Sequence, residues 1–474
     1  MTELVAPLPP RGHVVIRDAL VLSQDDAVGE LRGDIEVRDG AIVAVGPALD
    51  APGATPIDGA GTVAIPGFVD THWHLWGTLL RGAIGDGHEA GWFARKALLA
   101  PHLEPADTAT GVLLGATEGL LAGITTVHDW AHNVLSRADA DADLGALRAL
   151  GLRARFSYGA PSTSPLMSME QMRAVMAQVG VSPDEPMDFP EIGRIRDDWA
   201  PASDGLIEVG CAVRGPSRSS PEVYREEWRL ARELGLPIAM HCAGTRQEVA
   251  RIRQVEVLDA DGLLGPDLLL AHANWVSPDE MARLAAHDIP VSASPMSELR
   301  LAMGFPQLSE LRAAGVRVSL SLDTTAISAS ADPFQAMRVA LGLELTRAGD
   351  ATLMSPRDIL RIATLEGARS LGLGDRVGSI TPGKRADIVL ARLDGLDAAP
   401  MVDPAVAVVH SAGPADVDTV LVDGRVLVAA GRPAHVDPAA LVADASARLQ
   451  AVAGRAGFDL GTVWRPAPGA AAQA

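Results

Sequence analysis

Residues 67–77 read GFVDTHWHLWG and place two histidines, His72 and His74, at the end of a short apolar run. In a β-strand, side chains two positions apart point to the same face, so both imidazoles can contact one ligand. The apolar run before them is typical of a strand that is buried on both faces. This stretch therefore predicts a buried strand that ends in two side chains able to bind a metal.

The same texture recurs through the central part of the chain, where short apolar runs alternate with longer helical stretches. This alternation is typical of parallel strands joined by crossover helices. It predicts an α/β fold, a (β/α)8 TIM barrel, over residues 66–374. The candidate strands are AIPGFVD (64–70), TTVHDW (125–130), RARFSYG (153–159), LIEVGCAV (206–213), PIAMHC (237–242), LLLAHA (268–273), PVSAS (290–294) and RVSLSLD (317–323).

The two ends of the chain read as parts of a second, smaller unit. Residues 1–65 and 375–435 alternate apolar and polar positions around Asp-Gly pairs at 39–40 and 423–424, which are strong hairpin signals. Neither part has enough strands to be stable alone, so we expect them to pair into one small β-sandwich. Residues 436–474 are expected to form a C-terminal helix and a disordered tail.

The composition indicates an acidic globular protein that acts on a small molecule. The chain of 474 residues is 48% hydrophobic, and 40 basic against 60 acidic residues give a formal net charge of −20. Nucleic acids and anionic membranes attract a positive surface, so neither is an expected partner. Two cysteines are too few for a disulfide framework. Without a signal-peptide pattern or a long apolar run, we expect a cytoplasmic protein.

Four of the candidate strands end in side chains that can bind a metal. His72 and His74 follow the first strand, His241 the fifth, His272 the sixth and Asp323 the eighth. A single buried histidine is more often a core residue with a satisfied hydrogen bond. Because all five lie at the end of a strand, where the active sites of such barrels are built, we interpret them as one metal site.

These segments resemble the amidohydrolase superfamily of metal-dependent hydrolases, in its cytosine-deaminase-like and triazine-hydrolase-like branch. The resemblance rests on PGFVDTHWH, AMHCAG, LLLAHANW and the run SASPMSELRLAMGFPQLSELRAAGVRVSLSLDTT, and it covers nearly the whole chain. It implies one divalent metal ion, zinc in first place and iron, manganese or cobalt as alternatives. The implied ligands are His72, His74, His241 and Asp323.

The resemblance also implies roles in catalysis. A bound divalent ion lowers the pKa of a water from about 15.7 to about 7, and Asp323 is placed to take the proton of that water. His272 would bind this water or a polar group of the substrate. The fourth strand, LIEVGCAV, and the Arg-Gly that follow it have no lysine of the kind that bridges two ions in some relatives. A single ion and hydrolytic attack on an electrophilic carbon are therefore expected.

One position departs from the resemblance. Many deaminases of this branch carry a proton-shuttling glutamate three residues after the fifth-strand histidine, where this chain has Gly244. Glu248 could fold back, but we interpret it as an exposed helix residue. We therefore expect cleavage of a non-peptide C–N bond of the amide, urea, carbamate or cyclic amidine type. Release of ammonia from an amino-heterocycle is the alternative, and a catalytically silent assembly subunit is a remote third possibility.

The expected substrate is a small cyclic or aromatic molecule. Trp76 and Trp275 follow strand ends, where an indole can form a pocket wall for a flat ring, although a core role is the alternative for each. His132, after the second strand, and Arg214, after the fourth, are further candidates for contact with the substrate. Barrels of this branch commonly form dimers or larger assemblies, so a homo-oligomer is expected.

Overall fold

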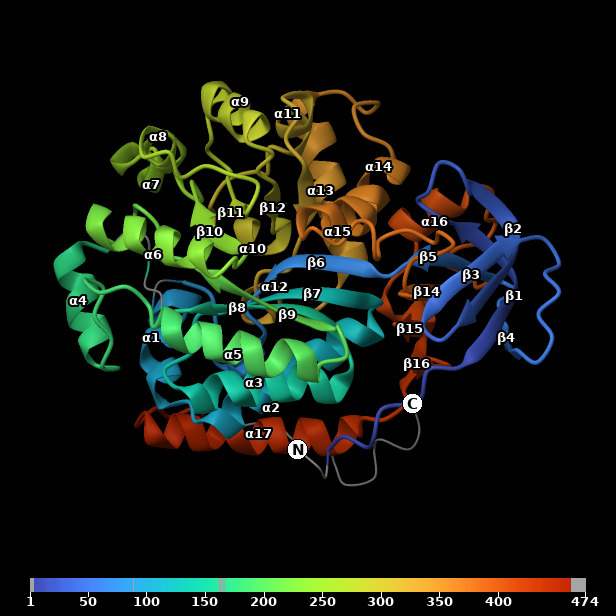
Figure 1. Cartoon of the computed structure of the whole chain (residues 1–474), viewed down its shortest axis with the longest axis horizontal. Helices are drawn as coiled ribbons and strands as arrows, with labels where there is room; N and C mark the ends of the chain where they lie inside the picture. The colour runs from blue at the N-terminus through green and yellow to red at the C-terminus, as the bar shows by residue number, and fades with distance from the viewer. Residues whose placement is uncertain (1–3, 88, 162–163, 165–166, 462–474) are drawn as a thin grey trace.

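The centre of the molecule is a barrel of eight parallel strands (Figure 1). The computed structural model describes residues 4–87, 89–161, 164 and 167–461. Neighbouring strands follow the order of the chain from β6 to β13, which confirms the predicted barrel. The strands are β6 (Phe68–Trp73), β7 (Ile124–Ala131), β8 (Arg153–Gly159), β9 (Ile207–Ala212), β10 (Ile238–Cys242), β11 (Leu268–His272), β12 (Val291–Ala293) and β13 (Val318–Leu320).

The barrel closes where β6 meets the chain that follows β13. The backbone N–H of Asp323 donates to the carbonyl of His72 at 2.9 Å, and the N–H of His74 donates to the carbonyl of Asp323 at 2.5 Å. Two residues before His72 on β6, the carboxylate of Asp70 accepts from the N–H groups of His72 at 3.0 Å and Leu322 at 2.9 Å. The seam between the first and last strands therefore holds two predicted metal ligands against a third.

Helices surround the barrel and bury their apolar faces against it. A capping box formed by Ser277 and Glu280 starts one of them, α9. The helices of this part are η1 (Leu75–Ala83), α1 (Trp92–Leu99), η2 (Ala100–His102), α2 (Pro105–Leu121), α3 (Arg137–Leu150), α4 (Met169–Ala177), α5 (Phe189–Ala202), α6 (Pro221–Glu233), α7 (Arg246–Arg251), α8 (Gln254–Ala260), α9 (Pro278–Ala286), α10 (Pro295–Arg300), α11 (Leu308–Ala313), α12 (Thr325–Ser328), α13 (Pro333–Ala348), α14 (Pro356–Arg361), η3 (Ile362–Glu366) and α15 (Gly367–Ser370).

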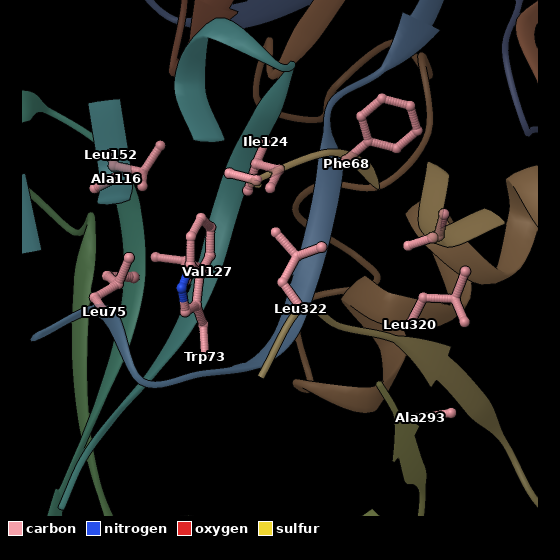
Figure 2. Close-up of a cluster of buried hydrophobic side chains, with 14 of the residues drawn as sticks. Phe68, Trp73, Leu75, Ala116, Ile124, Val127, Leu152, Ala293, Leu320 and Leu322 are labelled. Carbon is pink, nitrogen blue, oxygen red and sulfur yellow. The ribbon is translucent and has the colours of Figure 1, made fainter. Parts of the chain in front are cut away.

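Trp73 shows how the alternation of β6 separates the site from the core. His72 and His74 face the barrel interior, whereas Trp73 points the other way and is fully buried. Figure 2 shows its indole beside Val127, in a cluster of buried apolar side chains that also includes Leu75. Trp73 is therefore a packing residue, as its position in the strand predicts.

Strands from both ends of the chain join in one nine-stranded sheet beside the barrel (Figure 1). β14 pairs antiparallel with β5 and so connects the C-terminal strands to the N-terminal ones. The sheet encloses its own small apolar core, which includes Ile16, Ile35, Ile388 and Leu421. Its strands are β1 (His13–Leu22), β2 (Glu30–Arg38), β3 (Ala41–Gly46), β4 (Thr55–Asp58), β5 (Thr62–Pro66), β14 (Ile388–Arg392), β15 (Val417–Val422), β16 (Arg425–Ala429) and β17 (Arg432–Pro433).

The first predicted barrel strand, residues 64–70, is divided between two sheets. β5 remains in the small sheet as far as Pro66, and β6 begins at Phe68. Gly67 lies between them, and a Cβ atom there would be 2.0 Å from Oγ1 of Thr125. The chain therefore changes sheets at a close backbone approach that only glycine allows, inside a run that reads as one apolar strand.

The two predicted Asp-Gly hairpins are both present. Asp39 and Gly40 have φ of 50° and 84°, and Asp423 and Gly424 have φ of 53° and 73°. Positive φ at both central residues is the geometry of a type I′ turn. The two turns touch, because a Cβ on Gly424 would lie 2.5 Å from Cα of Gly40.

A C-terminal helix returns from the small sheet to the barrel. α17 (Pro438–Arg455) runs beside α2 (Figure 1) and is held there by ion pairs and by the hydrogen bond from Thr110 Oγ1 to Asp444 at 2.7 Å. α16 (Pro404–His410) and η4 (Pro414–Asp416) are the remaining helices of the described chain. None of the described helices combines the length and apolarity needed to cross a membrane. The predicted disordered tail after Trp464 lies outside the described residues.

Candidate metal centre and active site

Three predicted ligands converge on one point at the barrel seam. Nε2 of His72 lies 3.4 Å, and Nε2 of His74 lies 3.3 Å, from the same carboxylate oxygen of Asp323. Ligand atoms about 2.05 Å from a tetrahedral zinc ion are separated from one another by about 3.3 Å. Both nitrogens therefore lie at the distance from the carboxylate oxygen that a tetrahedral ion requires.

The ring nitrogens of His72 also indicate that this residue can bind a metal. Both of its ring nitrogens are buried, and neither has a hydrogen-bond partner among the described residues. An unsatisfied buried polar group of this kind costs about 1–3 kcal/mol. The ligand atoms of His72, His241 and His272 also lie within 4.8 Å of one another. The donor set fits a divalent ion, with imidazoles and one carboxylate around it.

Neighbouring groups orient the imidazoles. Nδ1–H of His74 donates to the carbonyl of Trp130 at 2.9 Å, which leaves Nε2 of His74 free of a proton on the side of Asp323. The indole of Trp130 stacks on the His241 ring with 4.2 Å between centroids. Burial lowers the pKa values of His72, His74 and His241, so all three rings are neutral, which is the form that binds a metal.

His272 differs from the other histidines because it has an acidic partner. Its Nδ1 lies 3.1 Å from the carboxylate of Glu298, which also accepts from the N–H of Ser294. Burial alone would lower the pKa of His272, but the hydrogen bond to Glu298 and the charge of Asp323 raise it above its usual value. A protonated His272 can donate a hydrogen bond from Nε2 into the site.

The backbone is strained at two of these residues. His272 has φ of 74° and Asp323 has φ of 62°, in the left-handed region that residues other than glycine rarely occupy. Such conformations cost about 1–3 kcal/mol each and persist where the surroundings fix them. Both occur where a strand ends and its side chain must turn into the barrel mouth.

A cavity of about 810 Å³ opens over this cluster and is lined by His74, His241, His272 and Asp323. Its volume suits a small organic substrate. One side of the cavity is apolar, with Trp92, Phe93, Met303 and Ile327 among its residues. The charged side chains that line it, apart from the aspartate, are Lys96, Arg218 and Glu248.

Glu248 is the main correction at this site. It is 2% exposed rather than lying on a solvated helix face. Its Oε2 accepts from the N–H of Gly244 at 3.0 Å, while its Oε1 is buried without a hydrogen-bond partner among the described residues. A Cβ on Gly244 would lie 3.7 Å from that Oε2, so the carboxylate of Glu248 occupies the space beside Gly244.

The sequence contains a signal for this placement. The segment TRQE, residues 245–248, has the S/T-x-x-E pattern of a capping box, in which the glutamate folds back over the start of its helix. Thr245 is the N-cap of α7, and its hydroxyl accepts from the N–H of Glu248 at 3.1 Å. The returning carboxylate bonds to the N–H of Gly244, one residue before the cap, and so reaches the cavity.

The predicted pocket tryptophans do not line this cavity. Trp76 instead lines a smaller adjoining pocket with Phe93 and Lys96, which also line the large cavity. Its ring centroid is 5.3 Å from that of His132 and 6.0 Å from that of Trp92. Trp275 donates from its indole N–H to the carbonyl of Met303 at 2.5 Å and supports the loop that does line the cavity. Trp92, on the long segment after β6, does line the large cavity.

His132 and Arg214 have different positions. His132 lines the cavity, as expected of a residue in contact with substrate. Arg214 is outside the residues that line it and makes a buried ion pair with Glu227 at 2.7 Å, so its proposed contact with substrate is replaced by a structural role. Arg218, four residues later in the same loop, reaches the cavity instead. The sequence indicated that an arginine in the loop after β9 could contact the substrate. The path of the folded loop determines which arginine points into the cavity.

A model of the amidohydrolase family matches residues 63–427. The chain belongs to the amidohydrolase family. It is similar to a 5'-deoxyadenosine deaminase of Methanothermobacter thermautotrophicus, with 33% identity over 86% of this chain and 91% of the relative. It is also similar to a 5-methylthioadenosine/S-adenosylhomocysteine deaminase of Desulforudis audaxviator, with 31% identity over 90% of this chain and 95% of the relative.

The chain is also similar to a solved structure over most of its length. The chain is similar to a zinc-bound adenosine deaminase of Xanthomonas campestris, with a TM-score of 0.81 and 27% identity over 94% of this chain and all of that one. The protein is a hydrolase of C–N bonds other than peptide bonds that acts on a small molecule, as the sequence predicts. The family and the zinc-bound structure also support a divalent metal, for which candidate ligands are present.

Proposed function

We propose that this amidohydrolase is an aminohydrolase that removes an amino group, as ammonia, from an amino-substituted heteroaromatic ring. The observation that carries the proposal is the buried carboxylate of Glu248 in the cavity. Its predicted exposure was the reason to favour amide-type cleavage, and that reason no longer applies. The deaminases among the relatives support the same narrower reaction.

The proposed metal is a single zinc ion held by His72, His74, His241 and Asp323, with iron, manganese or cobalt as alternatives. A bound divalent ion supplies a water whose pKa is about 7 and which is therefore a nucleophile at neutral pH. No lysine follows β9, the strand from which some relatives bridge two ions. This absence supports a single ion.

The side chains divide the proton transfers between them. Asp323 accepts the proton of the attacking water, and protonated His272 stabilises the charge that develops at the attacked carbon. Glu248 delivers a proton to the ring nitrogen, and Asp323 passes the proton that it took from the water to the amino group. The C–N bond then breaks with ammonia as the leaving group, while the remaining proton of the added hydroxyl returns to Glu248 and leaves a ring carbonyl. The apolar side of the cavity, with Trp92 and Phe93, holds the ring and excludes water.

Ammonia release by the zinc-loaded protein from a panel of aminopyrimidines, aminopurines and aminopteridines tests the proposal. On an identified substrate, Glu248→Gln should reduce kcat by about 10²- to 10⁴-fold, the usual contribution of a positioned acid-base group. Zinc content should stay near one per chain. The matched control is Glu256→Gln, which removes the same charge from an exposed position on α8.

Two results would contradict the proposal. Unchanged turnover in Glu248→Gln would exclude Glu248 as the proton donor. Products that contain a new carboxylate or a larger amine, with ammonia absent from the whole panel, would return the reaction to the amide, urea or carbamate type.

A further inference from the structure

We propose that Arg218, with Lys96 beside it, forms a subsite in the cavity for an anionic substituent of the substrate, specifically a carboxylate. The inference rests on the proposed function for the identity of the ring. It adds to that function a charged group of the substrate and the residue of this chain that binds it.

Arg218 is buried without a partner. It lies in the loop between β9 and α6, is 7% exposed, and lines the cavity. Its Nε is buried and unsatisfied, and its guanidinium makes no hydrogen bond or ion pair with any residue that the structure describes. Buried arginines are otherwise paired, because an isolated buried charge is costly.

Arg214 provides an internal comparison. It is buried to a similar degree, in the same loop, but its guanidinium bonds to Glu227 and to the carbonyls of Ser182 and Glu185. The protein therefore supplies acceptors to both terminal nitrogens of one arginine of the loop, although Nε of Arg214, like that of Arg218, has no partner among the described residues. The other arginine points its donors toward the cavity, where a ligand can accept from them.

A second cation lines the same cavity. Lys96, on α1, is 7% exposed and lines the cavity. Burial and the nearby charge of Arg218 lower the pKa of Lys96 to about 7, which indicates that the two cations share one region. Lys96 Nζ lies 3.4 Å from Nε2 of His132, whose ring packs against that of His74 with 3.9 Å between centroids. The subsite is thus close to the metal centre.

The carboxylates of the cavity have other tasks. Glu248 accepts from the N–H of Gly244, and its charge acts on Arg218 without forming an ion pair. Asp323 belongs to the ligand cluster. A substrate carboxylate is therefore the missing acceptor, and its two coplanar oxygens match the parallel N–H donors of a guanidinium.

Isothermal titration calorimetry of the zinc-loaded full chain tests the subsite without requiring turnover. The probes are matched pairs of a carboxylate and its carboxamide on the same amino-substituted ring, for example 4-aminopyrimidine-5-carboxylate and its amide, with pyridine and purine pairs beside it. The carboxylate should bind about 10- to 100-fold more tightly than the amide, as a charge-assisted hydrogen bond allows. Inorganic phosphate is included as a competing anion.

Substitutions of Arg218 test whether this residue causes the preference for the carboxylate. Arg218→Gln should remove the preference for the carboxylate, and Arg218→Lys should retain part of it. The control Arg246→Gln changes the same charge on the exposed start of α7, beside the cavity, and should leave the preference intact.

The proposal would be overturned by equal binding within every wild-type pair, by absence of carboxylate binding across all rings, or by a preference that survives in Arg218→Gln. Phosphate binding with no carboxylate preference would also overturn it. A carboxylate preference without ammonia release from any ring would instead reject the proposed aminohydrolase and leave the subsite in place.

Discussion

At the scale of single residues, Gly244 and Glu248 show how a carboxylate can reach the same space from a different position along a chain. The resemblance places a proton-shuttling glutamate at residue 244, and this chain supplies a carboxylate to the same space from residue 248. The first turn of α7 brings the side chain of Glu248 back to Gly244. The carboxylate therefore lies beside the cavity although it comes from a different position in the sequence.

This exchange predicts a rescue. In Glu248→Gln with Gly244→Glu, the new side chain would start in a position whose Cβ is 2.7 Å from Cε of Met303, the movable end of a flexible side chain. The double variant should recover at least about tenfold in kcat over the single variant, because a proton donor is restored. Steady-state kinetics at equal zinc content measures this. A folded, zinc-loaded double variant no faster than Glu248→Gln would contradict it.

Lys96 predicts a pH dependence of anion binding. Burial, and after it the charge of Arg218, lower the pKa of Lys96 to about 7, although the charge of Asp323 acts in the opposite direction. Its ammonium is present below that pH and lost above it, so affinity for a carboxylate probe should fall about 3- to 10-fold between pH 6 and pH 9. His132 and His74 also face this lysine, but burial lowers their pKa values and keeps them neutral in this range. Calorimetry on Lys96→Met should give a flatter profile.

At the scale of elements, the strands and hairpins followed from local patterns, and the positions of side chains in loops did not. An apolar run bounded by turns predicts a buried strand wherever it occurs. The sheet change at Gly67 depends instead on Thr125, which is distant in sequence. The choice between Arg214 and Arg218 depends on Glu227 in a neighbouring helix. Contacts of this kind are set by tertiary packing, which periodicity does not encode.

The contact between the two Asp-Gly turns predicts a local weak point. Gly424→Ala would place a Cβ 2.5 Å from Cα of Gly40 at a φ of 73°. Because backbone atoms cannot move aside cheaply, we expect a loss of about 1–3 kcal/mol in the free energy of unfolding. Urea denaturation measures it. Gly413→Ala, where the added Cβ has no neighbour within 4 Å, should stay within about 0.5 kcal/mol of the parent.

At the scale of the whole molecule, the proposed metal site lies where the barrel closes. The proposed ligands His72 and His74 meet Asp323 through backbone hydrogen bonds as well as through the shared ligand position. The recurring strand ends made most of this cluster predictable from sequence. The backbone hydrogen bonds at the seam were harder to predict, because they join segments at opposite ends of the barrel part of the chain.

Metal removal should therefore loosen the whole barrel. With free zinc at about 1,000 times its Kd, binding to the folded state adds about 4 kcal/mol to its stability. Chelation should lower the Tm by several degrees and speed hydrogen exchange at the amides of His74 and Asp323 more than at those of the small sheet. Differential scanning calorimetry and exchange mass spectrometry measure these effects. Equal exchange at the seam with and without zinc would contradict the coupling.

The seam also has a consequence for the order of events during synthesis. His72 emerges from the ribosome long before Asp323, and the full ligand set comes together only when the last strand docks against the first. A nascent or truncated barrel lacks that set and holds the ion weakly. With the proposed ligands, retention of the metal would therefore distinguish finished chains from unfinished ones.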